Sequence, residues 1–342
     1  MLSDVPLSKH STMRLGGPAA HLAEIHTYDD LYGAVKWAKK HDLPMIMIGG
    51  GSNIVWSDKG FSGLVMVNKL RGIDVIEQPD GSSTVNIAAG EIWDTVVERT
   101  VAMGLSGIEA LSLIPGTTGA TPVQNVGAYG QEIADTLVSV EVYDQETGKL
   151  TTITNDECNF SYRNSRFKSD DRDRFFITGI TLKLNHADPK PPFYASLQAY
   201  LDKNKIATFT PQTIRDAVIA IRTSKLPDPA KVANNGSFFG NPIVSSHTFD
   251  DIQSKYPHVV HWDMNNGAVK LSAAWLIERA GFRSVHDIET GMATWTPQPL
   301  VLVNEHAKNT ADLLKFRNKI IDKVDGMFHV RLEQEPELIG DN

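Results

Sequence analysis

The segment 113–130 constrains the fold of this chain more than any other part of the sequence. It is long, nearly uncharged and rich in small residues, whereas a surface loop normally carries charge. Small residues let the backbone approach a flat ligand closely. The side chains of Thr117, Thr121, Gln124 and Asn125 are neutral hydrogen-bonding groups that can orient such a ligand and its phosphates. We therefore expect a ligand-binding loop here, with a buried structural loop as the alternative.

A second glycine-rich segment, GGGSN at 49–53, follows the apolar run 43–48. This run is expected to be a buried strand that ends in a glycine turn. Consecutive backbone amides without Cβ atoms, together with a Ser hydroxyl and an Asn amide, can surround a pyrophosphate. A Rossmann fingerprint needs glycine at its sixth position, where Ile54 stands. The pattern therefore does not support a nicotinamide-binding Rossmann fold, and a purely structural glycine turn stays open.

Composition limits the size and partners of the protein. A chain of 342 residues with 41% hydrophobic content can form two or three packed domains. Its net charge of -8 offers no long-range attraction to nucleic acid or to an anionic membrane. The lone Cys158 cannot form an internal disulfide, residues 1–10 lack a signal-peptide pattern, and no run of about 18 apolar residues occurs. We expect a cytoplasmic protein without membrane segments.

Periodicity predicts a mixture of helices and strands. Helices are expected at 28–40, capped by Thr27 with Asp30, at 93–103, and from Pro211 onward. Strands are expected at 138–143 and 150–153, joined as a hairpin, and at 175–184. A final helix is expected at 310–325, capped by Asn309 and ended by Gly326. This pattern favours α+β domains rather than one doubly wound sheet.

The sequence IPGTTGATPVQNVGAYGQE, at 114–132, resembles the flavin-binding signature of the UDP-N-acetylenolpyruvoylglucosamine reductase family. Further matches follow in the order that the family has them, and the resemblance covers nearly the whole chain. They are residues 12–17, 49–53, 89–91, 161–168, 222–229, 235–242 and 332–335 with 339–340.

The resemblance implies a two-subdomain FAD-binding module of the PCMH or vanillyl-alcohol-oxidase type, followed by a C-terminal α+β substrate-binding domain. The expected divisions are an FAD-binding domain at 1–186, split near 70; a proline-rich linker, tyrosine loop and connecting helix at 187–222; a substrate domain at 223–332; and a tail at 333–342 that returns to the active site. The tyrosine loop is similar to that of the type I class of the family. A monomer is also implied.

The implied reaction is the reduction of enolpyruvyl-UDP-GlcNAc to UDP-N-acetylmuramate in peptidoglycan synthesis, with FAD and NADPH as cofactors. By similarity, Arg163 holds the substrate carboxylate, Ser237 donates the proton and Glu335 polarises the carboxylate beside Arg163. A shift of the alignment would make Glu337 the functional carboxylate instead. Lys225 or Asn241 would assist the Ser237 hydroxyl, which is a poor acid in water.

The resemblance also implies binding residues. Tyr194 would close over the diphosphate, with Tyr200 as a substitute, and Lys225, Asn241 and Gln298 would bind the uridine diphosphate. The residues implied to bind the cofactor are Gly49, Gly50, Gly51, Ser52, Asn53, Ile114, Pro115, Gly116, Thr117, Gly119, Ala120, Gln124, Asn125, Gly127 and Tyr129.

Two other functions remain open, namely an FAD-dependent hydroxy-acid or alcohol oxidase and a non-catalytic UDP-sugar-binding protein. No metal site is expected, because His258 and His261 have no carboxylate or thiol at a recognised ligand spacing. Cys158 is expected to be a small buried apolar residue rather than a nucleophile.

Overall fold

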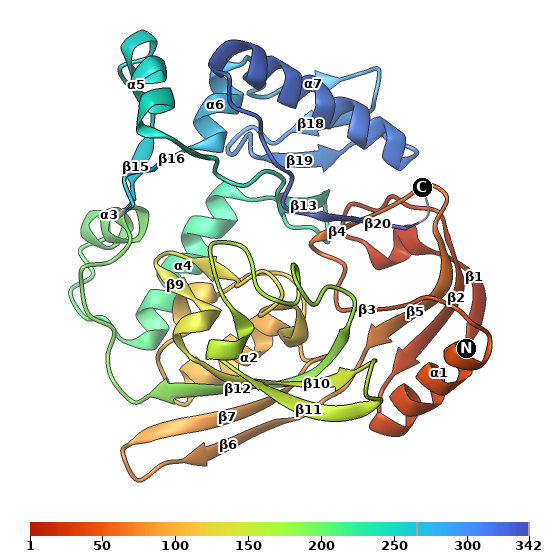
Figure 1. Cartoon of the computed structure of the whole chain (residues 1–342). Coiled ribbons are helices and arrows are strands. Elements are labelled where there is room, and N and C mark those ends of the chain that lie inside the picture. Colours follow the sequence, from red (N-terminus) through yellow and green to blue (C-terminus); the bar gives the residue numbers. More distant parts are fainter. Residues whose placement is uncertain (265, 341–342) are drawn as a thin grey trace. The chain divides into compact units, whose positions relative to one another are not determined.

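The computed structural model describes residues 1–264 and 266–340, and the chain divides into two units (Figure 1). Unit 1 comprises residues 1–5, 19–50 and 62–224. Unit 2 comprises residues 6–18, 51–61 and the described residues from 225 onward. Two short stretches near the N-terminus therefore belong with the C-terminal half of the chain. The limits expected at 186 and 222 separate the chain by the ligand that each part binds, and they stay predictions.

Unit 1 begins with a four-stranded sheet in the order β1-β2-β5-β3. Its strands are β1 (Leu2–Pro6), β2 (Pro18–Ile25), β5 (Phe61–Asn68) and β3 (Met45–Ile48), and β3 runs parallel to β5. Helix α1 (Tyr28–Lys40) buries Leu31 and Val35 against this sheet. The capping box that the sequence predicts between Thr27 and Asp30 is confirmed.

A five-stranded antiparallel sheet, in the order β11-β10-β12-β7-β6, forms the rest of the unit 1 core. Helix α2 (Trp93–Ala102) packs on it through Trp93 and Val97. The predicted hairpin and the strand after it are confirmed as three neighbouring strands. The strands are β6 (Ile73–Glu77), β7 (Ser82–Ala88), β10 (Leu137–Asp144), β11 (Lys149–Thr154) and β12 (Phe175–Asn185), and a two-stranded ribbon pairs β8 (Gly127–Ala128) with β9 (Gln131–Glu132).

Two helices close unit 1 after the proline-rich stretch. Helix α3 (Ala195–Lys203) and helix α4 (Pro211–Lys225) share one apolar cluster. The start of α4 at Pro211 is confirmed, and its stripe of Ile214, Val218 and Ile221 is buried as the spacing predicts.

Unit 2 is built on a four-stranded sheet in the order β13-β19-β18-β17 and on a three-stranded sheet in the order β14-β16-β15. Strands β4 and β20 form a separate parallel pair. The strands are β4 (Ile54–Trp56), β13 (Ala233–Ser237), β14 (Ile243–Val244), β15 (His261–Asp263), β16 (Val269–Leu271), β17 (His286–Asp287), β18 (Met292–Thr294), β19 (Val301–Asn304) and β20 (Glu337–Ile339); the helices are α5 (Ser246–Lys255), α6 (Ala273–Arg279) and α7 (Thr310–Phe328).

The predicted end of the last helix is wrong. Helix α7 starts at Thr310 under the predicted Asn309 cap, but it continues through Gly326 to Phe328. The left-handed residue that ends it is His329, with φ of 55°, whose amide donates to the carbonyl of Asp325. Burial of Phe328 in the unit 2 core extends the helix beyond the local stop signal. Among the described residues, no helix is both long and apolar enough to span a bilayer.

Candidate active site

The two glycine-rich segments meet in unit 1. A Cβ atom on Gly49 would lie 2.1 Å from Oγ1 of Thr117, and a Cβ atom on Gly50 would lie 3.2 Å from Cα of Gly116. A side chain at Gly49 would therefore collide with Thr117, and one at Gly50 would be crowded by backbone. The part of GGGSN in unit 1 thus packs directly on the first half of the segment 113–130.

Backbone hydrogen bonds hold residues 116–120 on the AGE motif at 89–91. The amide of Gly119 donates to the carbonyl of Ala89 at 2.8 Å, and the amide of Thr118 donates to the carbonyl of Glu91 at 2.9 Å. A Cβ atom on Gly119 would lie 2.6 Å from the Cβ of Ala89. The Thr118–Ala120 stretch in this close contact is a short 3-10 helix.

Asn125 joins the end of this loop to the arginine motif at 161–168. Its Nδ2 donates to Oε2 of Glu132 at 2.7 Å and to the carbonyl of Ser161 at 3.3 Å. Its Oδ1 accepts from the amide of Ala134. Asn125 is buried with φ of 45°, a conformation that asparagine tolerates better than most residues. Its amide therefore fixes the shape of the loop.

Arg163 lies in a tight turn in which Ser161 and Asn164 exchange backbone hydrogen bonds at 3.1 Å. Its φ of 55° is unusual for a bulky residue. Nη2 of Arg163 donates to the carbonyl of Gly127 at 2.8 Å, so the guanidinium reaches the same loop. Unit 1 therefore brings Arg163 together with the predicted cofactor segment.

Tyr129 and Tyr194 also meet within unit 1. Their rings are edge to face with centroids 6.2 Å apart, and burial raises the pKa of Tyr129 above its usual value. Tyr194 is 45% exposed, whereas Tyr200 packs against the apolar cluster of α3 and α4. Tyr194 is thus the more accessible of the two candidate tyrosines.

Asp94 and Arg215 anchor the start of the loop, and the sequence analysis did not identify them. The Arg215 guanidinium binds both carboxylate oxygens of Asp94, at 2.6 and 3.1 Å, and donates to Oγ of Ser112 at 2.9 Å. Asp94 also accepts the amide of Leu113. Burial raises the pKa of Asp94, but the hydrogen bonds from Arg215 and Leu113 outweigh it and lower the pKa overall. The sequence signal that could have identified this pair is the position of the charged Arg215 next to Ile214, which belongs to the apolar stripe of α4.

In unit 2, a β-bulge presents Ser237. Asn234 pairs with Val303 and Ser237 with Val301, so two residues of β13 oppose one residue of β19. Gly236, in the bulge, has φ of 69°, and its amide donates to Oδ1 of Asn234 at 2.8 Å. Glycine at this position allows the left-handed conformation without strain.

The C-terminal tail lies beside Ser237. The amide of Glu335 donates to the carbonyl of Phe238 at 2.9 Å, and the amide of Gly240 donates to the carbonyl of Glu333 at 3.1 Å. Glu337 lies in β20, where its amide donates to the carbonyl of Asn53. The structure therefore places the backbone of Glu335 beside the segment that follows Ser237 within unit 2.

The predicted nucleotide-binding residues have separate surroundings. Oδ1 of Asn241 accepts the amide of Ala273 at 3.0 Å, at the start of α6. Gln298 lies in the turn before Val301, the β19 partner of Ser237. Lys225 is exposed at the end of α4.

The residues present fit the FAD that the resemblance implies. Because Gly49 and Gly50 have no side chains, the backbones of the two glycine-rich segments lie in direct contact. Nε of Arg222, in unit 1, is among the buried polar atoms that have no hydrogen-bond partner in the described part of the chain. A buried polar atom without a partner costs about 1–3 kcal/mol, which a bound group can offset.

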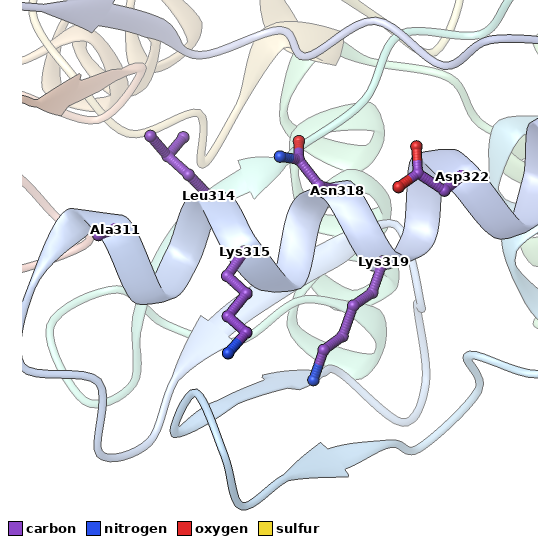
Figure 2. Close-up of a pocket in the computed structure, with 6 residues that line it drawn as sticks. All are labelled: Ala311, Leu314, Lys315, Asn318, Lys319 and Asp322. Atoms are coloured by element: carbon purple, nitrogen blue, oxygen red, sulfur yellow. The ribbon is translucent and has the colours of Figure 1, made fainter.

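A hollow of about 510 Å³ lies on α7 and contains none of the predicted site residues (Figure 2). Its Lys315 and Lys319 point the same way from the helix, and Lys319 binds Asp287 at 2.6 Å and Glu289 at 2.7 Å. Lys315 also pairs with Glu289, so both lysines have structural partners. In the ranges that the structure describes, no cluster of His, Cys, Asp and Glu side chains is suited to holding a metal ion.

Comparisons with known proteins agree with this arrangement. Residues 19–154 match the family model of the FAD binding domain, and residues 228–339 match the model of the UDP-N-acetylenolpyruvoylglucosamine reductase C-terminal domain. UDP-N-acetylenolpyruvoylglucosamine reductases of Ralstonia nicotianae and Cupriavidus pinatubonensis are each 40% identical, over 98% of this chain and 98% of theirs. The crystal structure of the Thermus caldophilus reductase aligns with a TM-score of 0.67 at 22% identity, over 98% of this chain and 97% of that one, and shows the same fold.

Proposed function

The chain belongs to the family of UDP-N-acetylenolpyruvoylglucosamine reductases, FAD-dependent oxidoreductases of peptidoglycan synthesis that use NADPH, and from this we propose a reaction carried by Arg163, Ser237 and Glu335. The substrate is UDP-N-acetylglucosamine bearing an enolpyruvyl ether, and the product is UDP-N-acetylmuramate. The likeness over 98% of the chain supports the whole activity rather than part of it.

When bound, FAD would supply the hydride chemistry of the reduction, with NADPH as the reductant, and the terminal carbon of the substrate alkene is the carbon that gains the hydride. Negative charge then develops on the neighbouring carbon and its carboxylate. The protein must stabilise this charge and deliver a proton to that carbon. Three side chains of this sequence suit these tasks.

Arg163 binds the substrate carboxylate. Its planar guanidinium matches a carboxylate in geometry and can donate two parallel hydrogen bonds to it. The hydrogen bond from Nη2 of Arg163 to the Gly127 carbonyl supports this role, because it holds the guanidinium at the predicted cofactor loop.

Ser237 protonates the carbanion, and Glu335 polarises the carboxylate. The single observation that supports this pair best is the hydrogen bond from the Glu335 amide to the Phe238 carbonyl, the residue next to Ser237. Glu337 makes its backbone bond to Asn53 instead, which favours Glu335 over Glu337. Lys225 or Asn241 assists the Ser237 hydroxyl in giving up its proton.

Tyr194 closes over the diphosphate, while Lys225, Asn241 and Gln298 bind the nucleotide. The exposure of Tyr194 and its contact with Tyr129 favour it over the packed Tyr200. We include in this proposal that the protein works as a monomer in the cytoplasm, where UDP-sugars and NADPH are available. The lone buried Cys158 is consistent with a reducing compartment.

One anaerobic titration tests the function. The purified protein should show a flavin spectrum that bleaches with NADPH and recovers on addition of the enolpyruvyl sugar. Bleaching of the flavin by a simple hydroxy acid in place of NADPH, with recovery on admission of oxygen, would instead indicate an oxidase of the related flavoprotein class. A colourless protein that binds the UDP-sugar would indicate a non-catalytic binder.

A further inference from the structure

Asn235 occupies a buried position between the serine strand and the GGGSN segment. The residue is 6% exposed. Its Nδ2 lies 3.1 Å from the carbonyl oxygen of Ser52, 3.2 Å from that of Ile54 and 3.2 Å from Oγ1 of Thr12. Two of these partners are carbonyl oxygens, which only accept hydrogen bonds, so the amide nitrogen must face them. The orientation of the Asn235 side chain is therefore determined.

The backbone around Asn235 couples it to Ser237. Residues 235 and 236 are the two bulge residues of β13, and Ser237 follows immediately. A bulge changes the direction in which the next side chain points. Since Asn234 holds Gly236 and Asn235 holds the segment 52–54, the bulge is anchored on both sides.

The segment 52–54 also holds the tail that carries Glu335. The carbonyl of Asn53 accepts the amide of Glu337 at 3.0 Å, and Nδ2 of Asn53 lies 3.5 Å from the carbonyl of Glu335. Strand β4, which starts at Ile54, pairs in parallel with β20. The tail in turn binds the carbonyl of Phe238. These hydrogen bonds form a closed circuit, in which Asn235 links the strand of Ser237 to the segment that places Glu335.

We propose that Asn235 is a positioning residue that sets the placement of Ser237 relative to Glu335 for the protonation step. Proton delivery requires the donor within hydrogen-bond reach of the accepting carbon, and a displacement of about 1 Å can cost a factor of about 10² in rate. In this proposal Asn235 acts through Ser237 and Glu335. It contacts neither the reacting carbon nor the hydride. The inference rests on the proposed function.

The test separates the two half-reactions by stopped-flow absorbance of the flavin. In Asn235→Ala, reduction of the flavin by NADPH should keep its normal rate. Reoxidation by the enolpyruvyl sugar should slow by about 10- to 100-fold. The half-saturating concentration of the sugar should change little. The solvent deuterium isotope effect on reoxidation should rise, because proton delivery becomes the slow step.

A double-mutant cycle shows whether Asn235 acts through Ser237. On a Ser237→Ala background, Asn235→Ala should produce no further loss of the residual reoxidation rate. The matched control is Asn304→Ala, because Asn304 in the neighbouring strand donates to the carbonyl of Met13 rather than to 52–54. This control should leave both half-reactions at parental rates. If Asn235→Ala does not fold, Asn235→Ser should show the same selective slowing to a smaller degree.

Several results would overturn the inference while the unmodified protein stays active. These are parental reoxidation in the Asn235 variants, equal slowing of both half-reactions, or losses that simply add in the double mutant. Failure of the unmodified, flavin-loaded protein to be reoxidised by the enolpyruvyl sugar would instead refute the proposed function, and the inference with it.

Discussion

The backbone amide of Glu335 donates a hydrogen bond to the carbonyl of Phe238 across 2.9 Å. The end of the described chain thereby returns to the strand that carries Ser237. Because a backbone hydrogen bond fixes the path of the chain, the backbone segments that carry Ser237 and Glu335 are neighbours in unit 2. This relationship makes the roles of individual residues testable.

Ser237→Ala should leave reduction of the flavin by NADPH intact and block its reoxidation by the enolpyruvyl sugar. The reason is that the hydroxyl takes no part in reduction by NADPH, whereas the carbanion formed by hydride addition reverts to the alkene unless Ser237 protonates it, and general acid catalysis supplies about 10²- to 10⁴-fold. Stopped-flow absorbance measures both steps. Loss of both half-reactions together would contradict this role for Ser237.

Glu335→Gln and Glu337→Gln form a matched pair that distinguishes the two carboxylates. Glu335→Gln should slow reoxidation strongly, by about 10²-fold or more, since it removes the carboxyl group that polarises the substrate carboxylate as negative charge develops. Glu337→Gln should behave like the parent, because the amide of Glu337 serves the β4–β20 pairing and its backbone is unchanged. The reverse order of the two effects would transfer the role to Glu337.

Tyr194→Phe should weaken binding of the UDP-sugar by about 10- to 100-fold, because the hydroxyl is a donor to the charged diphosphate. The melting temperature should stay unchanged, since the ring and its contact with Tyr129 remain. Tyr200→Ala should do the opposite, lowering the melting temperature through lost packing and sparing the affinity. Titration calorimetry measures the affinity of each variant, and thermal melts measure its stability. A loss of affinity in Tyr200→Phe would favour Tyr200 over Tyr194.

Arg215→Met should weaken FAD binding and stability together. Removing the guanidinium leaves the partly buried Asp94 carboxylate without its partner, which typically costs about 3–5 kcal/mol. The carboxylate is also the acceptor for the Leu113 amide at the start of the cofactor loop. Denaturant unfolding and flavin release measure the two effects. The double variant Arg215→Met with Asp94→Leu should recover part of the stability, and no recovery would argue against the pair.

The Asp144–Arg174 pair should make the free energy of unfolding fall at acidic pH. Hydrogen bonds from Arg174, at 2.9 and 3.2 Å, lower the pKa of the buried Asp144 to about 2. An unfolded Asp has a pKa of about 3.9. The pair therefore stabilises the fold fully above about pH 4 and loses its contribution as the pH falls from about 4 to about 2.

Asp144→Asn is the corresponding variant. It should lower the free energy of unfolding by about 1–3 kcal/mol near pH 7. The difference from the parent should shrink towards pH 2, because the parent carboxylate becomes protonated there. Urea unfolding across this pH range measures it, and a gap that stays constant would show that the charge of Asp144 is not responsible.

Local sequence signals predicted most of the regular elements. The Thr27–Asp30 capping box and the Pro211 helix start act within one turn of helix, so they need no distant partner. The buried Cys158, with its pKa raised to about 12 by burial, also agrees with the expected apolar role. Gly326 is the exception, since tertiary packing of Phe328 extended the helix beyond it.

The family resemblance named the site residues, but it could not give their contacts. The division of GGGSN between two structural units depends on the whole chain path, and no local pattern marks it. The Asp94–Arg215 pair joins helices far apart in sequence, so its burial is visible only in the folded chain.

The sequence alone determined the α+β character, the main helices and strands, and the two glycine segments that must approach another backbone, because propensity, capping and periodicity are short-range effects. Only the tertiary structure decided that the C-terminal tail pairs with β4, that a bulge presents Ser237, and that Asn235 joins them. Those features depend on which distant amide meets which carbonyl, and hydrogen-bond partners across the chain are selected by packing rather than by neighbouring residues.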